Sequence, residues 1–320
     1  MNPLSRRRFI DGGFKLLGAA SAARVLAPLS ALAPAGAALA APPATITITP
    51  LTPKDQGGLT LFQGAGCNVV ALPGPDGALL IDGGLAANSK ALLKAVAQAT
   101  GTRRVNTLIN THWHPEQTGS NEAVGKDGGL IIAHEVTRLY EGRKAYSACF
   151  EGTYGPLPPK ARATRTTRTT GSLTFAGVEV EYGYLPAAHT EGDLYVHFPQ
   201  HNVLVAGGPV AGDRWPVLDI HNGGWLGGLV RAYEHLATVV KADTRIVTTD
   251  GRLWSGADIV RYRDIYQQLF KQMFVYFNKG YGRSDAVANH PLKDYEAQLG
   301  DPAQFIAGAY QSLMQTYVPD

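Results

Sequence analysis

The segment His112-Trp113-His114-Pro115-Glu116 places two histidines two residues apart and an acid two residues beyond them. In an extended segment, alternate side chains point the same way, which would aim His112, His114 and Glu116 at one point and Trp113 away from it. Pro115 favours an extended backbone at His114, so part of this geometry is encoded locally. Imidazoles and a carboxylate that converge suit a zinc-like cation.

An apolar run at residues 105–109 comes directly before this segment and predicts a buried strand. Open α/β sheets usually place their sites at the carboxyl ends of strands. The sequence therefore predicts a metal site at the end of this strand.

Five motifs, taken in order, make the chain resemble the metallo-β-lactamase superfamily of hydrolases. They are Ala-Leu-Leu-Ile-Asp-Gly-Gly at 78–84, His-x-His-x-Glu-Gln at 112–117, Ala-His-Thr-Glu-Gly-Asp at 188–193, Leu-Val-Ala-Gly-Gly at 204–208 and Thr-Thr-Asp-Gly at 248–251. The family's own signature is H-x-H-x-D-H, its fourth motif normally ends in Gly-Asp, and its fifth is usually Pro-Gly-His-Gly. The resemblance covers roughly residues 45–280, and the ordered set is more specific than any single motif.

The resemblance implies one complete metal site. The three histidines that hold the family's first metal match His112, His114 and His189. Three histidines with an open fourth position form a catalytic zinc set, and such a metal lowers the pKa of its bound water to about 7. The expected cofactor is Zn²⁺, one ion per chain.

The family's second metal position is degenerate in this chain. Its usual ligands correspond here to Glu116, Gln117, Gly208 and Asp250. Gly208 has no side chain and Gln117 offers only a neutral amide, so a dinuclear centre is not expected. Glu116 and Asp250 are the candidate catalytic residues. Glu116 would orient or deprotonate water, and Asp250 would bind a substrate cation or hydrogen-bond a metal ligand.

Five further residues are candidates for contacts with the substrate or around the metal. Trp113 is a candidate apolar wall of the pocket, and Gln117 occupies a former ligand position. Asp193 can hydrogen-bond near the metal or simply begin a strand, and Asp82 is expected to orient the backbone near the site. His221 follows the fourth motif, where the family's chain passes the pocket rim, and can contact substrate or replace a lost ligand.

The first 40 residues predict an export signal and are excluded from the fold. Residues 5–10, Ser-Arg-Arg-Arg-Phe-Ile, resemble a twin-arginine signal, and Ala38-Leu39-Ala40 is a small-x-small cleavage site. The alternative is an ordinary secretory leader with a chance run of arginines. Arg24 and Pro28 interrupt the apolar run of the leader, which argues against a membrane span there, and no stable membrane insertion is expected after cleavage. We expect a periplasmic or secreted protein that meets the twin-arginine export machinery transiently.

The net charge gives no case for nucleic acid as a partner. The whole chain carries +3, whereas residues 1–40 carry five basic residues and one acid, or +4, so the remainder carries about −1. A basic patch is the usual footprint of nucleic-acid binding, and the charge balance predicts none. The expected partner is a small-molecule substrate.

The predicted fold class is α/β (α+β), a four-layer αββα sandwich with extra C-terminal helices; the specific architecture comes from the resemblance. Helical spacing of apolar residues predicts helices near 88–100, 226–240 and 259–277, and residues 150–170 are expected to be irregular. The expected domains are the export signal at 1–40, the metallo-β-lactamase-like domain at 41–280 and a helical extension packed on it at 281–320. Cys67 and Cys149 can pair in an oxidising compartment or stay as separate thiols.

Two functions remain open from the sequence. The first is an exported zinc hydrolase that acts on an ester, lactone, amide or thioester. The second is a non-catalytic periplasmic binding or accessory protein on a degenerate metallo-hydrolase scaffold, suggested by the changes at Gln117, Gly208 and Asp250.

Overall fold

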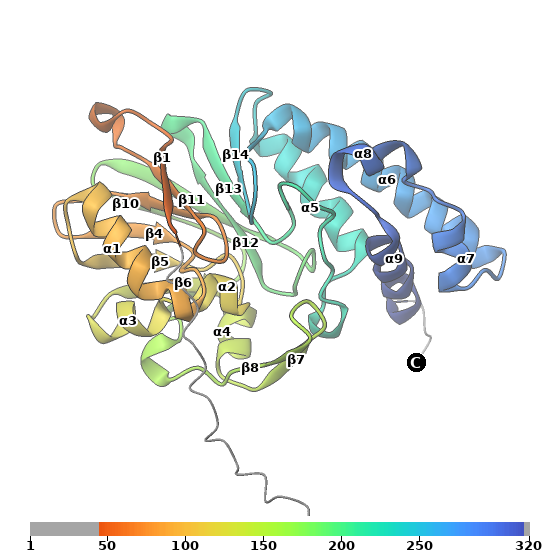
Figure 1. The fold of residues 1–320 in the computed structure, drawn as a ribbon, viewed down its shortest axis with the longest axis horizontal. Helices are drawn as coiled ribbons and strands as arrows, with labels where there is room; N and C mark the ends of the chain where they lie inside the picture. The colour runs from red at the N-terminus through yellow and green to blue at the C-terminus, as the bar shows by residue number, and fades with distance from the viewer. Residues whose placement is uncertain (1–44, 317–320) are drawn as a thin grey trace, which may run out of the picture. The chain divides into compact units, whose positions relative to one another are not determined.

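Two β-sheets pack face to face, with helices on both outer sides, in this computed structural model, which describes residues 45–316 (Figure 1). The described residues belong to one compact unit. The predicted export signal at 1–40 lies outside the described residues. Among the described residues, no helix combines the length and apolar character that a membrane crossing requires.

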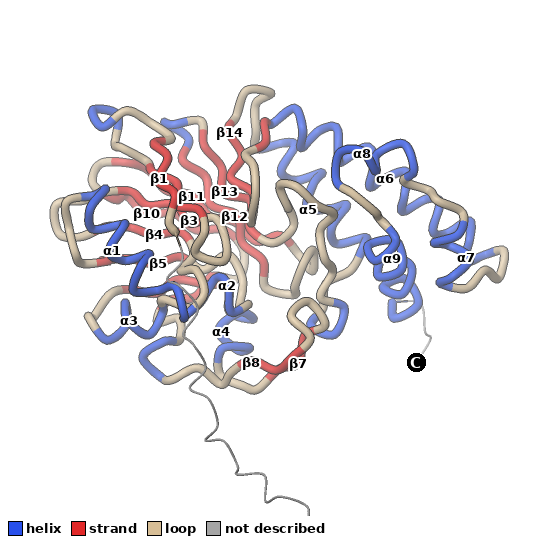
Figure 2. The backbone as a smooth tube through the Cα atoms, in the orientation of Figure 1, coloured by secondary structure: helices blue, strands red, loops and turns tan. Residues whose placement is uncertain are grey.

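The first sheet has seven strands and the second has six (Figure 2). The first sheet, in spatial order, consists of β1 (Thr47–Pro50), β2 (Thr60–Gln63), β3 (Val69–Leu72), β4 (Ala78–Ile81), β5 (Val105–Ile109), β6 (Leu130–His134) and β9 (Arg165–Thr167). The second consists of β10 (Thr170–Phe175), β11 (Val178–Leu185), β12 (Asp193–Phe198), β13 (Val203–Gly207), β14 (Arg245–Thr248) and β15 (Trp254–Ser255). A separate hairpin pairs β7 (Ala145–Ser147) with β8 (Gly152–Tyr154).

Strands β4, β5, β6 and β9 run parallel to one another. Their carboxyl ends therefore meet at one edge of the first sheet, and the loop after β5 carries the first two histidines. In the second sheet β11 and β12 are antiparallel neighbours, and the loop that joins them carries His189. The two loops meet at this edge of the first sheet, where the three histidines lie close together.

The helices divide into two outer layers. They are α1 (Ser89–Thr100), α2 (Pro115–Thr118), α3 (Asn121–Lys126), α4 (Glu135–Glu141), α5 (Leu226–Val239), α6 (Gly256–Asn278), α7 (Arg283–Ala288), α8 (Glu296–Leu299) and α9 (Ala303–Thr316). Helices α1 and α3 contribute to the apolar cluster on the outer face of the first sheet. Helices α5 and α6 cover the outer face of the second sheet, and α9 packs against these two helices (Figure 1).

The interior between the sheets is built from alternate strand residues. Leu79 and Ile81 of β4 face Val196 and Val205 of the second sheet in one apolar cluster, whereas Leu80 turns to the helices outside. Both faces of β4 are buried, which explains why the strand is a continuous apolar run instead of an alternating one. The predicted αββα sandwich with C-terminal helices is confirmed.

Two local predictions were wrong. Residues 152–154 and 165–167 form strands β8 and β9, although 150–170 was predicted to be irregular. Strand β10 at 170–175, which begins at the end of that range, was not predicted either. Every residue of these three strands is exposed or half exposed, so their apolar signal is weak. Residues 115–118 form a helical turn, α2, so Glu116 does not continue an extended segment. Pro115 stands at the first position of that turn, where proline is favoured.

The C-terminal segment packs on the second helical layer. Leu299, Phe305, Ile306, Tyr310 and Leu313 are buried in the same apolar cluster as α5 and α6. The domain boundary near residue 280 stays a prediction.

Candidate metal centre

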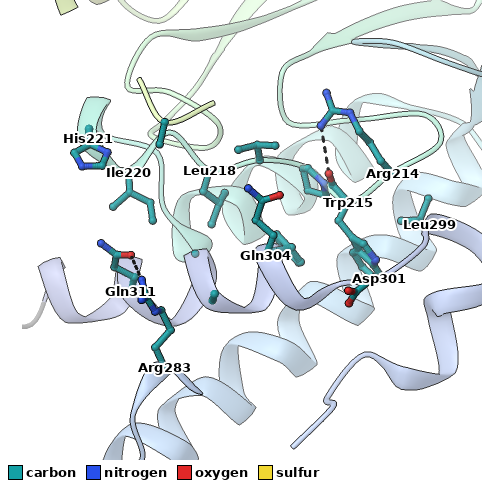
Figure 3. Close-up of a pocket in the computed structure, with 16 residues that line it drawn as sticks. Arg214, Trp215, Leu218, Ile220, His221, Arg283, Leu299, Asp301, Gln304 and Gln311 are labelled. Carbon is teal, nitrogen blue, oxygen red and sulfur yellow. Dashed lines mark hydrogen bonds between the residues drawn. The ribbon is translucent and has the colours of Figure 1, made fainter. Parts of the chain in front are cut away.

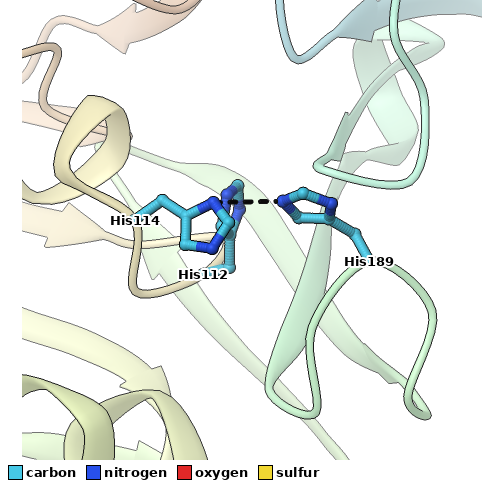
Figure 4. A group of neighbouring side chains, drawn as sticks. All are labelled: His112, His114 and His189. Atoms are coloured by element: carbon cyan, nitrogen blue, oxygen red, sulfur yellow. Dashed lines mark hydrogen bonds between the residues drawn. The ribbon is translucent and has the colours of Figure 1, made fainter. Parts of the chain in front are cut away.

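Three histidines from two loops meet at the edge of the first sheet. His112 and His114 follow β5, and His189 comes from the β11–β12 loop (Figure 4). One ligand atom from each lies within 4.8 Å of the others, and all three residues are buried. His114 has an extended backbone, φ −64° and ψ 156°, as expected before Pro115.

Each imidazole has a hydrogen-bond partner on its outer nitrogen. His114 Nε2 donates to Asp219 Oδ2 at 2.8 Å, and His189 Nδ1 donates to the Val217 carbonyl at 2.6 Å. A carboxylate and a carbonyl oxygen can only accept a hydrogen bond, so the ring nitrogen that faces each of them must carry the proton, which fixes the tautomer of both rings. Outer partners of this kind orient metal-binding histidines.

The third ring is fixed through a hydroxyl. Thr111 Oγ1 donates its hydrogen to Asp82 Oδ2 at 2.8 Å, so it accepts from His112 Nδ1 at 3.2 Å. Asp82 Oδ1 also accepts the Thr111 backbone N–H at 2.8 Å. Asp82 therefore holds the start of the histidine loop, as the sequence suggested for it, and burial raises the pKa of its carboxyl to about 7.

These tautomers leave His112 Nε2, His114 Nδ1 and His189 Nε2 with inward lone pairs. His189 Nε2 and His114 Nδ1 lie 3.2 Å apart, and neither carries a proton to place between them. Two acceptor nitrogens this close repel each other unless a cation lies beside both. Two ligands of a tetrahedral zinc at 2.0–2.1 Å would lie about 3.3 Å apart. The donor set therefore fits the metal that the family implies.

Burial keeps the imidazoles of His112 and His189 neutral. Burial and the neighbouring imidazoles hold the pKa of His112 well below its usual value, and burial lowers the pKa of His189 to about 3. Burial acts against ionisation of Asp219, but hydrogen bonds from His114 and Asn222 outweigh it and lower the pKa of that carboxyl. Neutral imidazoles are the form that binds a metal.

Asp193 organises the third loop. Its carboxylate accepts from the His189 N–H at 2.6 Å, the Thr190 N–H at 2.8 Å and the Thr190 hydroxyl at 2.7 Å. Burial raises the pKa of Asp193 to about 7. The residue both begins β12 and orients the backbone of a candidate ligand, so it combines the two roles that the sequence left open.

A cavity of about 190 Å³ adjoins the three histidines. Glu116, Gln117 and Asp250 line it, so the structure brings both candidate catalytic residues to the triad. The Asp250 carboxylate is paired with Arg214, which also lines the cavity, with 2.7 Å between Nη2 and Oδ2.

Gly208 and Gln117, at which the resemblance would place ligands of a second metal, have different surroundings. A Cβ atom added at Gly208 would lie 2.2 Å from His189 Cδ2 and 2.7 Å from its Cγ, so the His189 ring fills the space beside this residue. Gln117 Oε1 is buried without a hydrogen-bond partner among the described residues. Its Nε2 contacts Thr249 Oγ1 at 3.4 Å.

Two other candidates do not line this cavity. Trp113 is buried and stacks on Tyr140, with ring centroids 5.0 Å apart. It also contacts the ring of His114 edge-on, so it packs against one of the candidate metal-binding histidines. His221 is exposed and lines a neighbouring cavity, where its ring meets Tyr146.

Sequence reasoning missed Arg214 and Phe150, which line the cavity. Neither belongs to a motif, and no local pattern could have indicated them. Cys149 lines the cavity as a free thiol, and Cys67 is a buried free thiol that donates to the Glu116 carbonyl at 2.9 Å.

Solved structures with this fold include several metallo-hydrolases. The metallo-beta-lactamase from Pontibacter korlensis is 19% identical and has a TM-score of 0.53, with 69% of this chain and 94% of that chain covered. DIM-1 metallo-beta-lactamase is 14% identical, with a TM-score of 0.55 and coverage of 71% and 98%. The stereoselective inverting sec-alkylsulfatase Pisa1 from Pseudomonas sp. is 17% identical, with a TM-score of 0.58 and coverage of 85% of this chain and 50% of that one. At these identities the likeness shows the fold alone.

A search of curated proteins finds no significant match. The family model described as the metallo-beta-lactamase superfamily matches residues 63–249, which is more than half of the chain. Three histidines positioned to bind a metal lie within that match, at the end of β5 and in the β11–β12 loop. The chain belongs to the metallo-beta-lactamase superfamily.

Proposed function

We propose that this protein is an exported hydrolase that uses one zinc ion against an ester, lactone, amide or thioester of a small molecule. The observation that carries the proposal is the set of three inward lone pairs on His112, His114 and His189, each fixed by an outer hydrogen bond. A zinc ion held there supplies Lewis acidity and lowers the pKa of a bound water to about 7.

The protein's own groups around the cavity have distinct tasks. Glu116 accepts the proton of the attacking water, because this residue lines the cavity that the three histidines also line. Gln117 Oε1 accepts a hydrogen bond from substrate or water, since this buried atom has no partner among the described residues. Asp250 holds Arg214 at the cavity by their 2.7 Å ion pair.

A single metal is supported by the contacts at the former second position. The His189 ring stands where a side chain at Gly208 would begin. The Asp250 carboxylate is engaged by Arg214 through both Nε and Nη2, and Gln117 brings a neutral amide. None of these arrangements favours a second cation.

The test is the substitution His114→Ala, with metal content measured by inductively coupled plasma mass spectrometry and turnover measured on a panel of esters, lactones and β-lactams. Metal and turnover should be lost together, because the triad loses a ligand and Asp219 loses its partner. His235→Ala is the matched control, because His235 is exposed on α5. Unchanged turnover in His114→Ala would contradict the proposal.

The second candidate is a non-catalytic binding protein, and the changed second position is the observation that favours it. A protein that binds one zinc ion per chain yet hydrolyses nothing in the panel would support that candidate. Export by the twin-arginine route is part of the proposal and is supported by the arginine motif at residues 5–10.

A further inference from the structure

A second cavity, of about 330 Å³, lies between the 214–221 segment and helix α9 (Figure 3). Its volume falls within the range of small-molecule sites. Nothing in the metal chemistry described above uses it.

This cavity borders the metal centre directly. Arg214 and Val217 line both cavities, and the Val217 carbonyl is the acceptor that fixes His189. On the opposite side, Ala148 lines the larger cavity and Cys149 lines the metal cavity. The two cavities therefore border each other at Arg214 and Val217.

The larger cavity has a mixed lining: apolar side chains form part of it, and polar groups come from Arg214, His221, Arg283, Asp301, Gln304 and Gln311. Trp215 and Phe305 stack with ring centroids 5.5 Å apart, and Leu218 and Ile220 continue the lining. Arg214 stands where the two cavities meet. Its guanidinium has five N–H groups. Nε and Nη2 each donate to Asp250 Oδ2, and Nη1 donates to the Trp215 carbonyl with 3.4 Å between the nitrogen and the oxygen.

We propose that this cavity is a subsite for the apolar acyl chain of the substrate and that Arg214 receives the acyl oxygen at its head. The inference rests on the proposed hydrolase function and narrows the substrate to an ester, thioester, lactone or amide with a medium-length acyl chain. Hydrolysis adds the hydroxyl of water to the acyl carbon and breaks its bond to the leaving oxygen, sulfur or nitrogen. The leaving group takes the remaining hydrogen, and the product is a carboxylate that an arginine can hold.

Direct binding of two carboxylates tests the subsite without any turnover. Decanoate and butyrate are titrated into the protein as purified, by isothermal titration calorimetry. Their head groups are identical, so any contact with a metal affects both equally, and each buried methylene is worth up to about fourfold in affinity. Decanoate should bind at least about tenfold more tightly than butyrate.

The substitution Gly308→Leu fills the cavity from α9. A Cβ at Gly308 would meet only Ile220 Cδ1, at 3.8 Å, so a larger side chain enters the cavity without striking backbone. The substitution should abolish the advantage of decanoate and leave butyrate binding and the hydrolysis of a two-carbon ester unchanged. Gly308→Ala is the matched control, because it changes helix propensity without filling the space. Ala307→Leu, which also faces the cavity, replaces Gly308→Leu if that variant does not fold.

The head group is tested by Arg214→Gln, which should weaken decanoate about tenfold or more and leave binding of neutral 1-decanol unchanged. Equal affinities for decanoate and butyrate, or full decanoate binding in folded Gly308→Leu, would overturn the proposal. Decanoate binding that is lost in Gly308→Leu supports the subsite even if no ester is hydrolysed. Hydrolysis of short esters without any chain-length effect would keep the hydrolase function and reject the subsite.

Discussion

Replacing Gly208 with Asp restores the residue that the family normally has at the end of its fourth motif. A simple expectation is the gain of a second metal. The structure predicts the opposite, because the new Cβ would lie 2.2 Å from His189 Cδ2, 2.7 Å from Cγ and 3.0 Å from Cβ. Carbon atoms in contact are normally about 3.5–4.0 Å apart, so the His189 ring has to move by more than about 1 Å.

The size of the effect follows from what that movement breaks. Metal–ligand distances tolerate about 0.2 Å, and the shift also breaks the 2.6 Å bond from His189 Nδ1 to the Val217 carbonyl. Loss of an outer partner alone typically costs about 10–100-fold in metal affinity, which is about 1.4–2.7 kcal/mol. We expect at least this loss for Gly208→Asp.

Zinc affinity measured by competition with a chromophoric chelator, together with metal content per chain, provides the assay. Gly208→Ala is the control, because it adds the same Cβ without a ligand atom and should weaken zinc similarly. Melting temperatures of the metal-free proteins show whether the variants remain folded. Two zinc ions per chain in Gly208→Asp, with the first bound as tightly as before, would refute the reasoning.

Three further predictions follow from individual contacts. Asp219→Asn replaces the acceptor of His114 Nε2 and should lower zinc affinity about 10–100-fold while the chain stays folded; unchanged affinity in the chelator competition would show that Asp219 does not orient the ring. Burial raises the pKa of Glu141 from 4.5 to about 7. Between these two pH values the folded protein keeps the proton that the unfolded chain has lost, so the free energy of unfolding falls by up to about 3 kcal/mol as the pH rises from 4.5 to 7. Glu141→Gln should remove that part of the slope in urea titrations at a series of pH values, and parallel curves for the two proteins would argue against it. Replacing Arg6 and Arg7 with Lys should abolish export without changing the mature protein, measured by cell fractionation; undiminished periplasmic protein would indicate an ordinary secretory leader.

The sequence alone was sufficient for the elements whose signal is local. Residues 105–109 form the predicted strand, and the helix predicted at 226–240 is observed at Leu226–Val239. The period of apolar residues encodes such elements because it reflects which face of a helix or strand is buried. Strands β9 and β10 were not predicted, because an edge strand can be held by backbone pairing to one neighbour and then shows little apolar pattern.

The three histidines were also predictable, since their identities and their order along the chain carry the family resemblance. The hydrogen-bond and ion-pair partners around the site could not be predicted from the sequence. His114 pairs with Asp219 across 105 residues, and Arg214 pairs with Asp250 across 36. Such partners meet only when separate loops pack together, so no spacing in the sequence encodes them.

Gly208 shows the division between the two sources of information most clearly. The sequence by itself shows that this position offers no side-chain ligand, because glycine has no side chain. Only the tertiary structure decided why no ligand can simply be added back, because the His189 ring, brought in by the β11–β12 loop, fills the space that a side chain would need.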